Sequence, residues 1–187
     1  MPYEFGNSNI KVTNADTDDS VRLREIALEA NIDAWTAADY SEEIGRIDSI
    51  VLKAESSNGE ILGFLVARIV PSNSAGQDAE LYNIAVRPAL QRSGVGGLLI
   101  ADLFQRLRID EVNCVWLEVR ASNSNAINFY SKYGFTNVSV RRNFYSDPTE
   151  DAVTMGFAFP ACRRPARSGP RASFPCLARR GRPQPAR

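Results

Sequence analysis

The chain of 187 residues contains no histidine. This absence excludes Ser-His-Asp and Cys-His nucleophilic catalysis, and it excludes metal sites built on imidazole ligands. Proton transfer in any active site must therefore use Glu, Asp, Tyr, Cys or Lys side chains, the backbone or water. Cysteine is scarce and odd in number, with no Cys-x-x-Cys pair, so neither a disulfide framework nor a metal cofactor is indicated.

Long apolar runs are also missing, since no stretch approaches the about 18 residues that cross a membrane. Residues 1–5 lack the basic and apolar regions of a secretory signal. We therefore expect a cytoplasmic protein without a membrane partner. Hydrophobic residues make up 44% of the chain, which is enough for the core of one domain.

A glycine-rich loop is the most informative segment that is present. It follows a predicted strand at 79–86 and a turn at Pro88, and it opens a predicted helix from about Val95. Gly94, Gly96 and Gly97 lack a Cβ atom, so a ligand can approach the main chain closely. The first N–H groups of a helix have no intrahelical partner, and the helix dipole adds partial positive charge there. The loop is therefore typical of a backbone site for phosphate.

The type of phosphate site follows from the neighbouring residues. A Walker loop needs Lys-Ser/Thr after its last glycine, whereas Leu98 and Leu99 follow here. The dinucleotide fingerprint fails because its third glycine is missing. The pattern that remains is Gln/Arg-x-x-Gly-x-Gly/Ala at residues 91–96. An ordinary glycine-rich turn before a helix is the alternative.

The remaining pattern alternates strands and helices, with further strands expected at 10–13, 49–55, 60–70, 112–119, 135–145 and 152–159. Helices are expected from Thr17 to about Asn31, from Ser41, and from Ser122 or Asn123 to Gly134. Between the second and third strands, Asn-Gly predicts a type I′ turn. This order predicts a mixed α/β sheet that starts with a hairpin and has crossover helices.

Residues 160–187 break the pattern, because proline and arginine are interspersed there without apolar periodicity. We expect a domain at 1–159 followed by a disordered tail at 160–187. Residues 161–187 hold eight Arg and no acid, while residues 1–160 hold 14 basic and 22 acidic residues. A basic tail can bind nucleic acid through phosphate contacts, and a functionless extension is the alternative.

A second motif follows the strand at 112–119. It reads Trp-Leu-Glu-Val-Arg-Ala-Ser-Asn at 116–123, and it continues with Ala126-Ile127, Phe129-Tyr130 and Lys132-Tyr133-Gly134-Phe135. Together with the glycine loop and with residues 141–145 and 150–152, it resembles the GNAT N-acetyltransferase superfamily. Within that superfamily the likeness is to the bacterial RimI-type ribosomal-protein-alanine N-acetyltransferases. The resemblance covers about residues 80–155 and is looser back to Trp35.

The resemblance implies the GNAT fold, a mostly antiparallel sheet that splays between two parallel central strands and is flanked by helices. Acetyl-CoA would lie in the V-shaped opening between the strands at 79–86 and 112–119. Backbone groups of the first strand would bind the pantetheine arm, the glycine loop would hold the pyrophosphate, and Asn123 would contact the cofactor. The cofactor-binding residues implied are Ile84, Ala85, Val86, Arg92, Ser93, Gly94, Val95, Gly96, Gly97 and Asn123.

The same resemblance implies the catalytic groups. Glu118 matches the general base that deprotonates the amine, and Tyr130 matches the general acid that protonates the thiolate of coenzyme A. The amine would attack acetyl-CoA directly, without a covalent enzyme intermediate. From the residues alone, Glu118 remains open to being a solvated carboxylate, Tyr130 to being a core residue and Asn123 to being only a helix cap. Glu80 is the rival base, and Tyr145 is a weaker polar candidate.

By resemblance, the acceptor is the N-terminal alanine of ribosomal protein bS18, and the acidic body of the chain suits a basic partner. Two alternatives stay open within the same fold. One is acetyl transfer to another protein N-terminus, a lysine or a small amine. The other is a catalytically silent module that binds acetyl-CoA.

Overall fold

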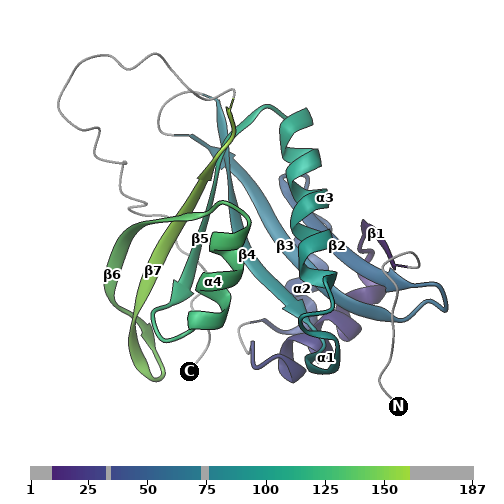
Figure 1. Cartoon of the computed structure of the whole chain (residues 1–187). Coiled ribbons are helices and arrows are strands. Elements are labelled where there is room, and N and C mark those ends of the chain that lie inside the picture. Colours follow the sequence, from purple (N-terminus) through teal and green to yellow (C-terminus); the bar gives the residue numbers. More distant parts are fainter. Residues whose placement is uncertain (1–9, 33–34, 73–75, 161–187) are drawn as a thin grey trace.

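The computed structural model describes residues 10–32, 35–72 and 76–160. The strands are β1 (Ile10–Asn14), β2 (Ser49–Ser56), β3 (Ile61–Pro71), β4 (Gln77–Val86), β5 (Val112–Arg120), β6 (Thr136–Ser146) and β7 (Thr149–Ala158). They form one sheet in the order β1-β2-β3-β4-β5-β7-β6 (Figure 1). Every neighbouring pair is antiparallel except β4 and β5, which are parallel. The predicted fold class is therefore confirmed.

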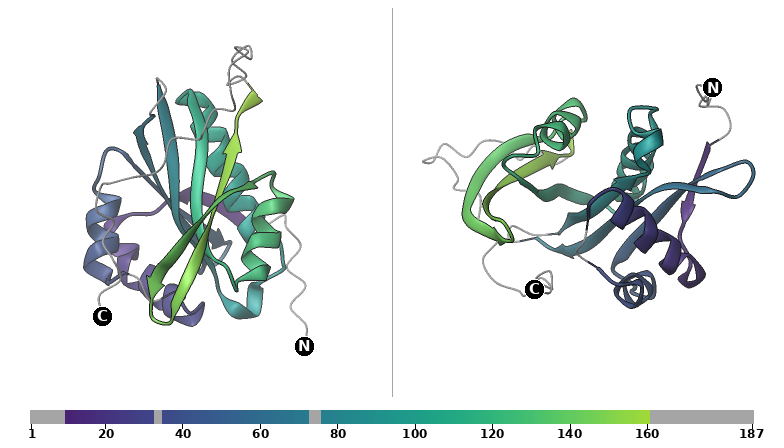
Figure 2. Two further views of the ribbon diagram at one scale, coloured as in Figure 1. Left: turned by 90° about the vertical axis from the view of Figure 1, so that its left-hand side faces the viewer. Right: turned by 90° about the horizontal axis from the view of Figure 1, so that it is seen from below.

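Helices cover both faces of this sheet. They are α1 (Ser20–Glu29), α2 (Ala37–Ile44), α3 (Val95–Ile109) and α4 (Ser124–Lys132), with short 3-10 turns η2 (Thr17–Asp19) and η3 (Pro88–Leu90). Seen from below, α3 and α4 lie on one side of the sheet and α1 and α2 on the other (Figure 2). Each side has its own apolar cluster. Because β3 contributes to both clusters, its first seven residues are all buried and it reads as a continuous apolar run.

The start of the second helix was predicted wrongly. Ser41 lies inside α2, which begins at Ala37 with Thr36 as its N-cap. The backbone N–H of Asp39 donates to Thr36 Oγ1 at 3.2 Å, and the Thr36 N–H donates to Asp39 Oδ2 at 2.7 Å. This reciprocal capping box satisfies two N–H groups that Ser41 cannot reach, so it sets the helix start four residues earlier.

The turn of the β2–β3 hairpin also differs from the prediction. A type I′ turn needs positive φ at both central residues, and Gly59 has φ +82° whereas Asn58 is not in the positive region. The Gly59 N–H donates to the Ser56 carbonyl, and the Ser56 N–H donates to the Glu60 carbonyl, both at 3.0 Å. The loop therefore has three residues and ends in a left-handed glycine, which is the next most common hairpin connection.

The described part of the chain ends shortly after the last strand. β7 ends at Ala158, and Phe159 remains 5% exposed in the core. Its N–H donates to the Asn113 carbonyl at 3.1 Å. Except for Pro160, the predicted tail lies outside the described residues, as do residues 1–9 of the predicted domain. Within the described ranges, no helix is long and apolar enough to span a membrane.

Candidate active site

An opening between β4 and β5 is the central feature of the site. Parallel pairing of the two strands runs from Gln77 beside Val112 only to Leu81 beside Leu117. Both strands continue beyond this point, and their carboxyl halves diverge (Figure 1). The last three residues of β4, 84–86, pair with β3 on their other side alone. Backbone groups on the edge that faces β5 are thus available to a ligand.

A β-bulge lies where the two strands part. Val66 pairs with Asn83 and Ala67 pairs with Leu81, so Tyr82 is an extra residue on β4. Bulges of this kind bend a strand and re-aim its side chains. The bulge separates the paired first part of β4 from the part that borders the opening.

The glycine loop starts beside the end of β4. Gln91 Nε2 donates to the Val86 carbonyl at 3.3 Å, and Ser93 Oγ donates to the Leu90 carbonyl at 2.6 Å. Arg92 and Gly94 have φ of +66° and +97°. Left-handed residues of this kind occur in anion-binding nests, although the Ser93 N–H between them donates to the Leu90 carbonyl at 3.3 Å.

The start of α3 completes the loop. Gly94 is the N-cap, and the first helical bond runs from the Leu98 N–H to the Gly94 carbonyl at 3.1 Å. The N–H groups of residues 94–97 therefore precede the intrahelical ladder and can bind an anion. The loop fits a pyrophosphate by the chemistry of its backbone donors.

Two of the glycines have a second role, in the packing of α3 against α4. A Cβ atom at Gly96 would lie 3.2 Å from the Phe129 ring. A Cβ atom at Gly97 would overlap the Tyr133 hydroxyl and would lie 3.1 Å from ring atom Cζ. Phe129 and Tyr133 are four residues apart and share one helix face. The absence of side chains at Gly96 and Gly97 thus lets this aromatic face approach α3.

Glu118 lies on β5 at the edge of the opening. Val115, Leu117 and Val119 belong to the apolar cluster on the α3 side. Side chains alternate along a strand, so Glu118 points to the opposite side, which carries α1 and α2. Its side chain is only 1% exposed, and Arg141 Nη1 lies 2.5 Å from its Oε1. The interpretation of Glu118 as a solvated carboxylate is therefore wrong.

Tyr130 lies on α4, on the other side of the sheet. Asn123 caps this helix, since its Oδ1 accepts the Ala126 N–H at 3.0 Å. The Tyr130 ring packs against Phe135 at a centroid distance of 5.7 Å, and the residue is 8% exposed. Burial raises the pKa of the Tyr130 hydroxyl, and the neighbouring Tyr145 raises it further. At neutral pH the hydroxyl therefore keeps its proton and can donate it.

The comparisons with known proteins match this geometry. The model of the acetyltransferase (GNAT) family matches residues 20–135, which is more than half of the chain. The chain belongs to the GNAT family. It is therefore an N-acetyltransferase by family, and the resemblance stated from the sequence is confirmed.

Individual relatives of this GNAT chain are similar over most of their length. The [ribosomal protein bS18]-alanine N-acetyltransferase of Escherichia coli K12 is 32% identical over 146 residues, which cover 77% of this chain and 94% of the relative. An N-alpha-acetyltransferase of Sulfurisphaera tokodaii is 31% identical over 160 residues, which cover 81% and 92%. The crystal structure of the E. coli ribosomal-protein-S18-alanine N-acetyltransferase superimposes with a TM-score of 0.70 at 30% identity, covering 80% of this chain and 93% of that one.

Arg141 is a site residue of this GNAT chain to which the sequence assigned no role. It reaches Glu118 from β6, and its guanidinium carbon lies 4.3 Å above the Phe144 ring. The pair neutralises a carboxylate that would otherwise be buried with its charge uncompensated. The contact depends on β7 lying between β5 and β6, and this strand order has no local signal in the sequence.

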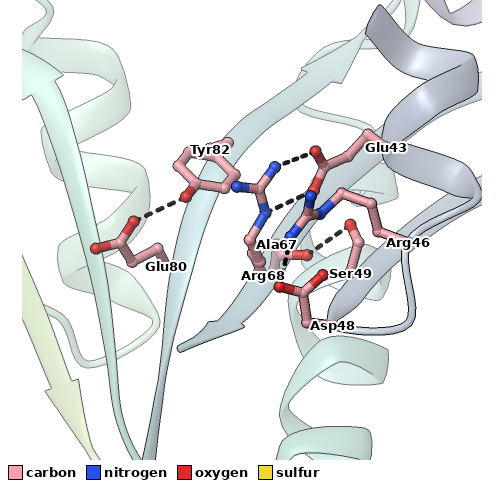
Figure 3. Close-up of polar contacts among 8 residues, drawn as sticks. All are labelled: Glu43, Arg46, Asp48, Ser49, Ala67, Arg68, Glu80 and Tyr82. Atoms are coloured by element: carbon pink, nitrogen blue, oxygen red, sulfur yellow. Dashed lines mark hydrogen bonds and ion pairs between the residues drawn. The ribbon is translucent and has the colours of Figure 1, made fainter. Parts of the chain in front are cut away.

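Glu80, the rival base, belongs to a polar network on the face that Glu118 shares (Figure 3). Tyr82 donates its hydroxyl to Glu80 Oε2 at 2.9 Å, and the Arg68 guanidinium lies 5.1 Å from the centre of the Tyr82 ring. Arg68 in turn donates Nε to Oε1 of the buried Glu43 at 3.0 Å. This chain of contacts ties α2 to the bulge of β4 and fixes the direction of Glu80.

The structure brings part of the predicted site residues together at the opening between β4 and β5. The loop residues 92–97 and the strand end 84–86 adjoin it from the β4 side. Glu118 and Tyr130 belong to β5 and α4 and lie on opposite faces of the sheet. Among the described residues, no group of three or more His, Cys, Asp or Glu side chains is placed to hold a metal ion.

Proposed function

We propose that this enzyme transfers the acetyl group of acetyl-CoA to the N-terminal α-amino group of a protein, and that the acceptor is the N-terminal alanine of ribosomal protein bS18. The observation that carries the reaction is the opening between β4 and β5, which has an anion-binding loop at one side and the buried Glu118 carboxylate at the other. The relatives named for this acceptor support its identity. A ribosomal acceptor implies a reaction in the cytoplasm.

In this proposal, acetyl-CoA is held mainly by backbone groups. Residues 92–97 bind the pyrophosphate, mainly through the N–H groups of residues 94–97, and residues 84–86 bind the pantetheine arm along the free edge of β4. Asn123 contacts the cofactor from the start of α4, in addition to capping that helix. When bound, acetyl-CoA supplies the activated acetyl group as a thioester.

The proposed chemistry needs one base and one acid. The acceptor ammonium gives a proton to the Glu118 carboxylate, and the neutral nitrogen then attacks the thioester carbonyl carbon. A C–N bond forms and the C–S bond breaks, so the sulfur leaves with the electron pair. Tyr130 donates its hydroxyl proton to that thiolate. The acetylated nitrogen loses its second proton to water, which leaves a neutral amide, and Glu118 and Tyr130 return to their starting protonation states by exchange with solvent. N–H groups on the β4 edge stabilise the negative charge on the carbonyl oxygen during attack.

Charges on the acceptor side favour a cationic amine. Glu80 and Glu118 lie on the same face of neighbouring strands, and Asp78 joins them there as the acceptor of the Trp116 indole N–H at 3.2 Å. Asp78 and Glu80 add negative charge beside the Glu118–Arg141 pair, and such charge raises the local concentration of a cationic substrate. Glu80 is the alternative base in this arrangement, acting through a water molecule.

Turnover of acetyl-CoA with a hexapeptide copying the bS18 N-terminus tests the proposal. We expect turnover to fall about 100-fold or more in Glu118→Gln and in Tyr130→Phe, with acetyl-CoA binding retained. Glu111→Gln is a matched control, because Glu111 is an exposed carboxylate in the turn between α3 and β5.

The panel of acceptors also contains the same peptide with an acetylated N-terminus, a lysine peptide and small amines. Turnover of only the lysine peptide or a small amine would overturn the acceptor and keep the reaction. Cofactor binding without turnover on any amine would instead support the silent module.

A further inference from the structure

Arg120, the last residue of β5, joins the site to the tip of the β6–β7 hairpin. Its guanidinium donates to the Asp147 carbonyl at 2.9 Å, the Pro148 carbonyl at 3.3 Å and Glu150 Oε2 at 3.1 Å. These three acceptors all belong to the hairpin tip, which is far from Arg120 in the sequence. The planar Arg120 guanidinium therefore fixes the hairpin tip through hydrogen bonds to several acceptors.

Glu150 extends this link to the start of α4. Its second oxygen, Oε1, accepts the Ser122 N–H at 2.6 Å. Hydrogen bonding from Ser122, and then from Arg120, lowers the pKa of the Glu150 carboxyl. Ser122 immediately precedes Asn123, the N-cap of the helix that carries Tyr130. The hairpin tip, the end of β5 and the start of α4 are thus joined through one carboxylate.

Arg120 also reaches the ring of Tyr145 on β6. The Arg120 guanidinium carbon lies 4.2 Å from the centre of the Tyr145 ring. Stacking of this kind fixes the plane of an aromatic ring beside the guanidinium. Tyr145 adds to the raised pKa of the Tyr130 hydroxyl, for which burial is the larger cause.

We propose that Arg120 is a positioning residue for acetyl transfer: through Glu150 it holds the tip of the β6–β7 hairpin against the start of α4 and so fixes the direction of the Tyr130 hydroxyl. The inference rests on the proposed function, in which Tyr130 donates the proton. Arg120 itself contacts neither the substrates nor the proton that Tyr130 transfers. Its removal should therefore slow the chemical step more than it weakens the binding of acetyl-CoA, since Asn123 alone among the proposed cofactor contacts lies on the linked segment.

A double-mutant cycle between Arg120→Gln and Tyr130→Phe tests this role. We expect Arg120→Gln to lower kcat about tenfold and to change KM for acetyl-CoA less than about twofold, because a small misplacement of a catalytic group slows the chemical step. In the Tyr130→Phe background the same substitution should have less than about a twofold effect. Arg142→Gln is the matched control, since Arg142 pairs with Asp151 on the same hairpin but its side chain is 85% exposed.

If the kcat losses of the two single variants multiply in the double variant, the proposal is overturned. A higher KM for acetyl-CoA with unchanged kcat in Arg120→Gln would overturn it too. Hydrogen exchange provides a second readout that needs no turnover. Arg120→Gln should speed exchange about tenfold in peptides covering 121–131 and 143–150, and Arg142→Gln should not. Unchanged exchange in those peptides would overturn the link, whereas an inactive wild-type protein with faster exchange in Arg120→Gln would overturn the proposed function alone.

Discussion

Alanine at Gly97 should destabilise the protein, although alanine normally stabilises a helix. Gly97 lies in the first turn of α3 and faces the Tyr133 hydroxyl of α4. A methyl group there would overlap that hydroxyl, so the Tyr133 side chain must swing away or the two helices must separate. Overpacking of this kind costs about 1–3 kcal/mol, against a gain of about 1 kcal/mol for replacing glycine in a helix.

The expected change in the free energy of unfolding follows from these two opposing effects. With an overlap energy near 2 kcal/mol, Gly97→Ala should lower the free energy of unfolding by about 1 kcal/mol. In a Tyr133→Phe background the hydroxyl is gone, although ring atom Cζ still lies 3.1 Å from the new methyl carbon. There the alanine should raise the free energy of unfolding by up to about 1 kcal/mol. The coupling between the two positions should therefore be about 2 kcal/mol.

Urea unfolding of the wild type, both single variants and the double variant measures this coupling. The comparison is valid while the slope of the free energy against urea stays the same in all four proteins. Equal effects of alanine in the two backgrounds would refute the reasoning, because the coupling would then be zero. The glycine would in that case serve the ligand alone.

Three further predictions follow from other positions. Gly96→Glu should abolish acetyl-CoA binding in calorimetry, since it places a carboxylate at the N-terminus of α3; its Cβ would also lie 3.2 Å from the Phe129 ring, so circular dichroism of the variant must match the wild type for the loss to report on the anion site. Gly63→Ala should lower the melting temperature, because its Cβ would lie 2.6 Å from the Ala85 carbonyl oxygen, which is backbone and cannot move aside; an unchanged melting temperature would contradict this. Tyr130 has a raised pKa, so above about pH 10 the native state holds a proton that the unfolded state has lost, and stability falls by about 1.4 kcal/mol per pH unit. Tyr130→Phe should remove this contribution from the slope measured between about pH 10 and 11 and leave that of Tyr40, whose pKa burial also raises; an equal slope in both proteins would contradict the prediction.

Much of the fold can be predicted from the sequence because its signals are local. The strand at 79–86 alternates buried and half-buried residues, and the glycine loop marks the start of α3 within one residue. Gly134, with φ +88°, ends the α4 segment as expected. Each of these features depends on residues only a few positions apart, so the pattern alone is sufficient.

The errors arose where two local signals competed. Ser41 with two following glutamates has the composition of a helix start, but Thr36 and Asp39 form a reciprocal capping box upstream. Asn58-Gly59 favours a two-residue turn, but the Ser56–Glu60 pairing closes a longer loop. In both cases the sequence contains both patterns, and the hydrogen bonds of the folded chain decide which one is used.

The polar contacts of the site depend on strand order, which has no local signal. Arg141 reaches Glu118, and Arg120 reaches the hairpin tip, because β7 returns between β5 and β6. The sequence separation is 23 residues for the first contact and 27 for the second. The family resemblance pointed to Glu118 and Tyr130, but it could not supply these partners.

The short pairing between β4 and β5 has a consequence for how the molecule unfolds. One part of the sheet, β1 to β4, is a run of sequential antiparallel neighbours, and the other is β5-β7-β6. The two parts share strand pairing only along residues 77–81 and 112–117, so they are joined at one end alone. A ligand bound between the two parts would replace missing hydrogen bonds across the opening. At a concentration 100 times its dissociation constant, the ligand would add about 2.7 kcal/mol to the stability of the folded protein. Cofactor supply in the cell would then set how long each molecule resists unfolding and proteolysis, as well as how fast it works.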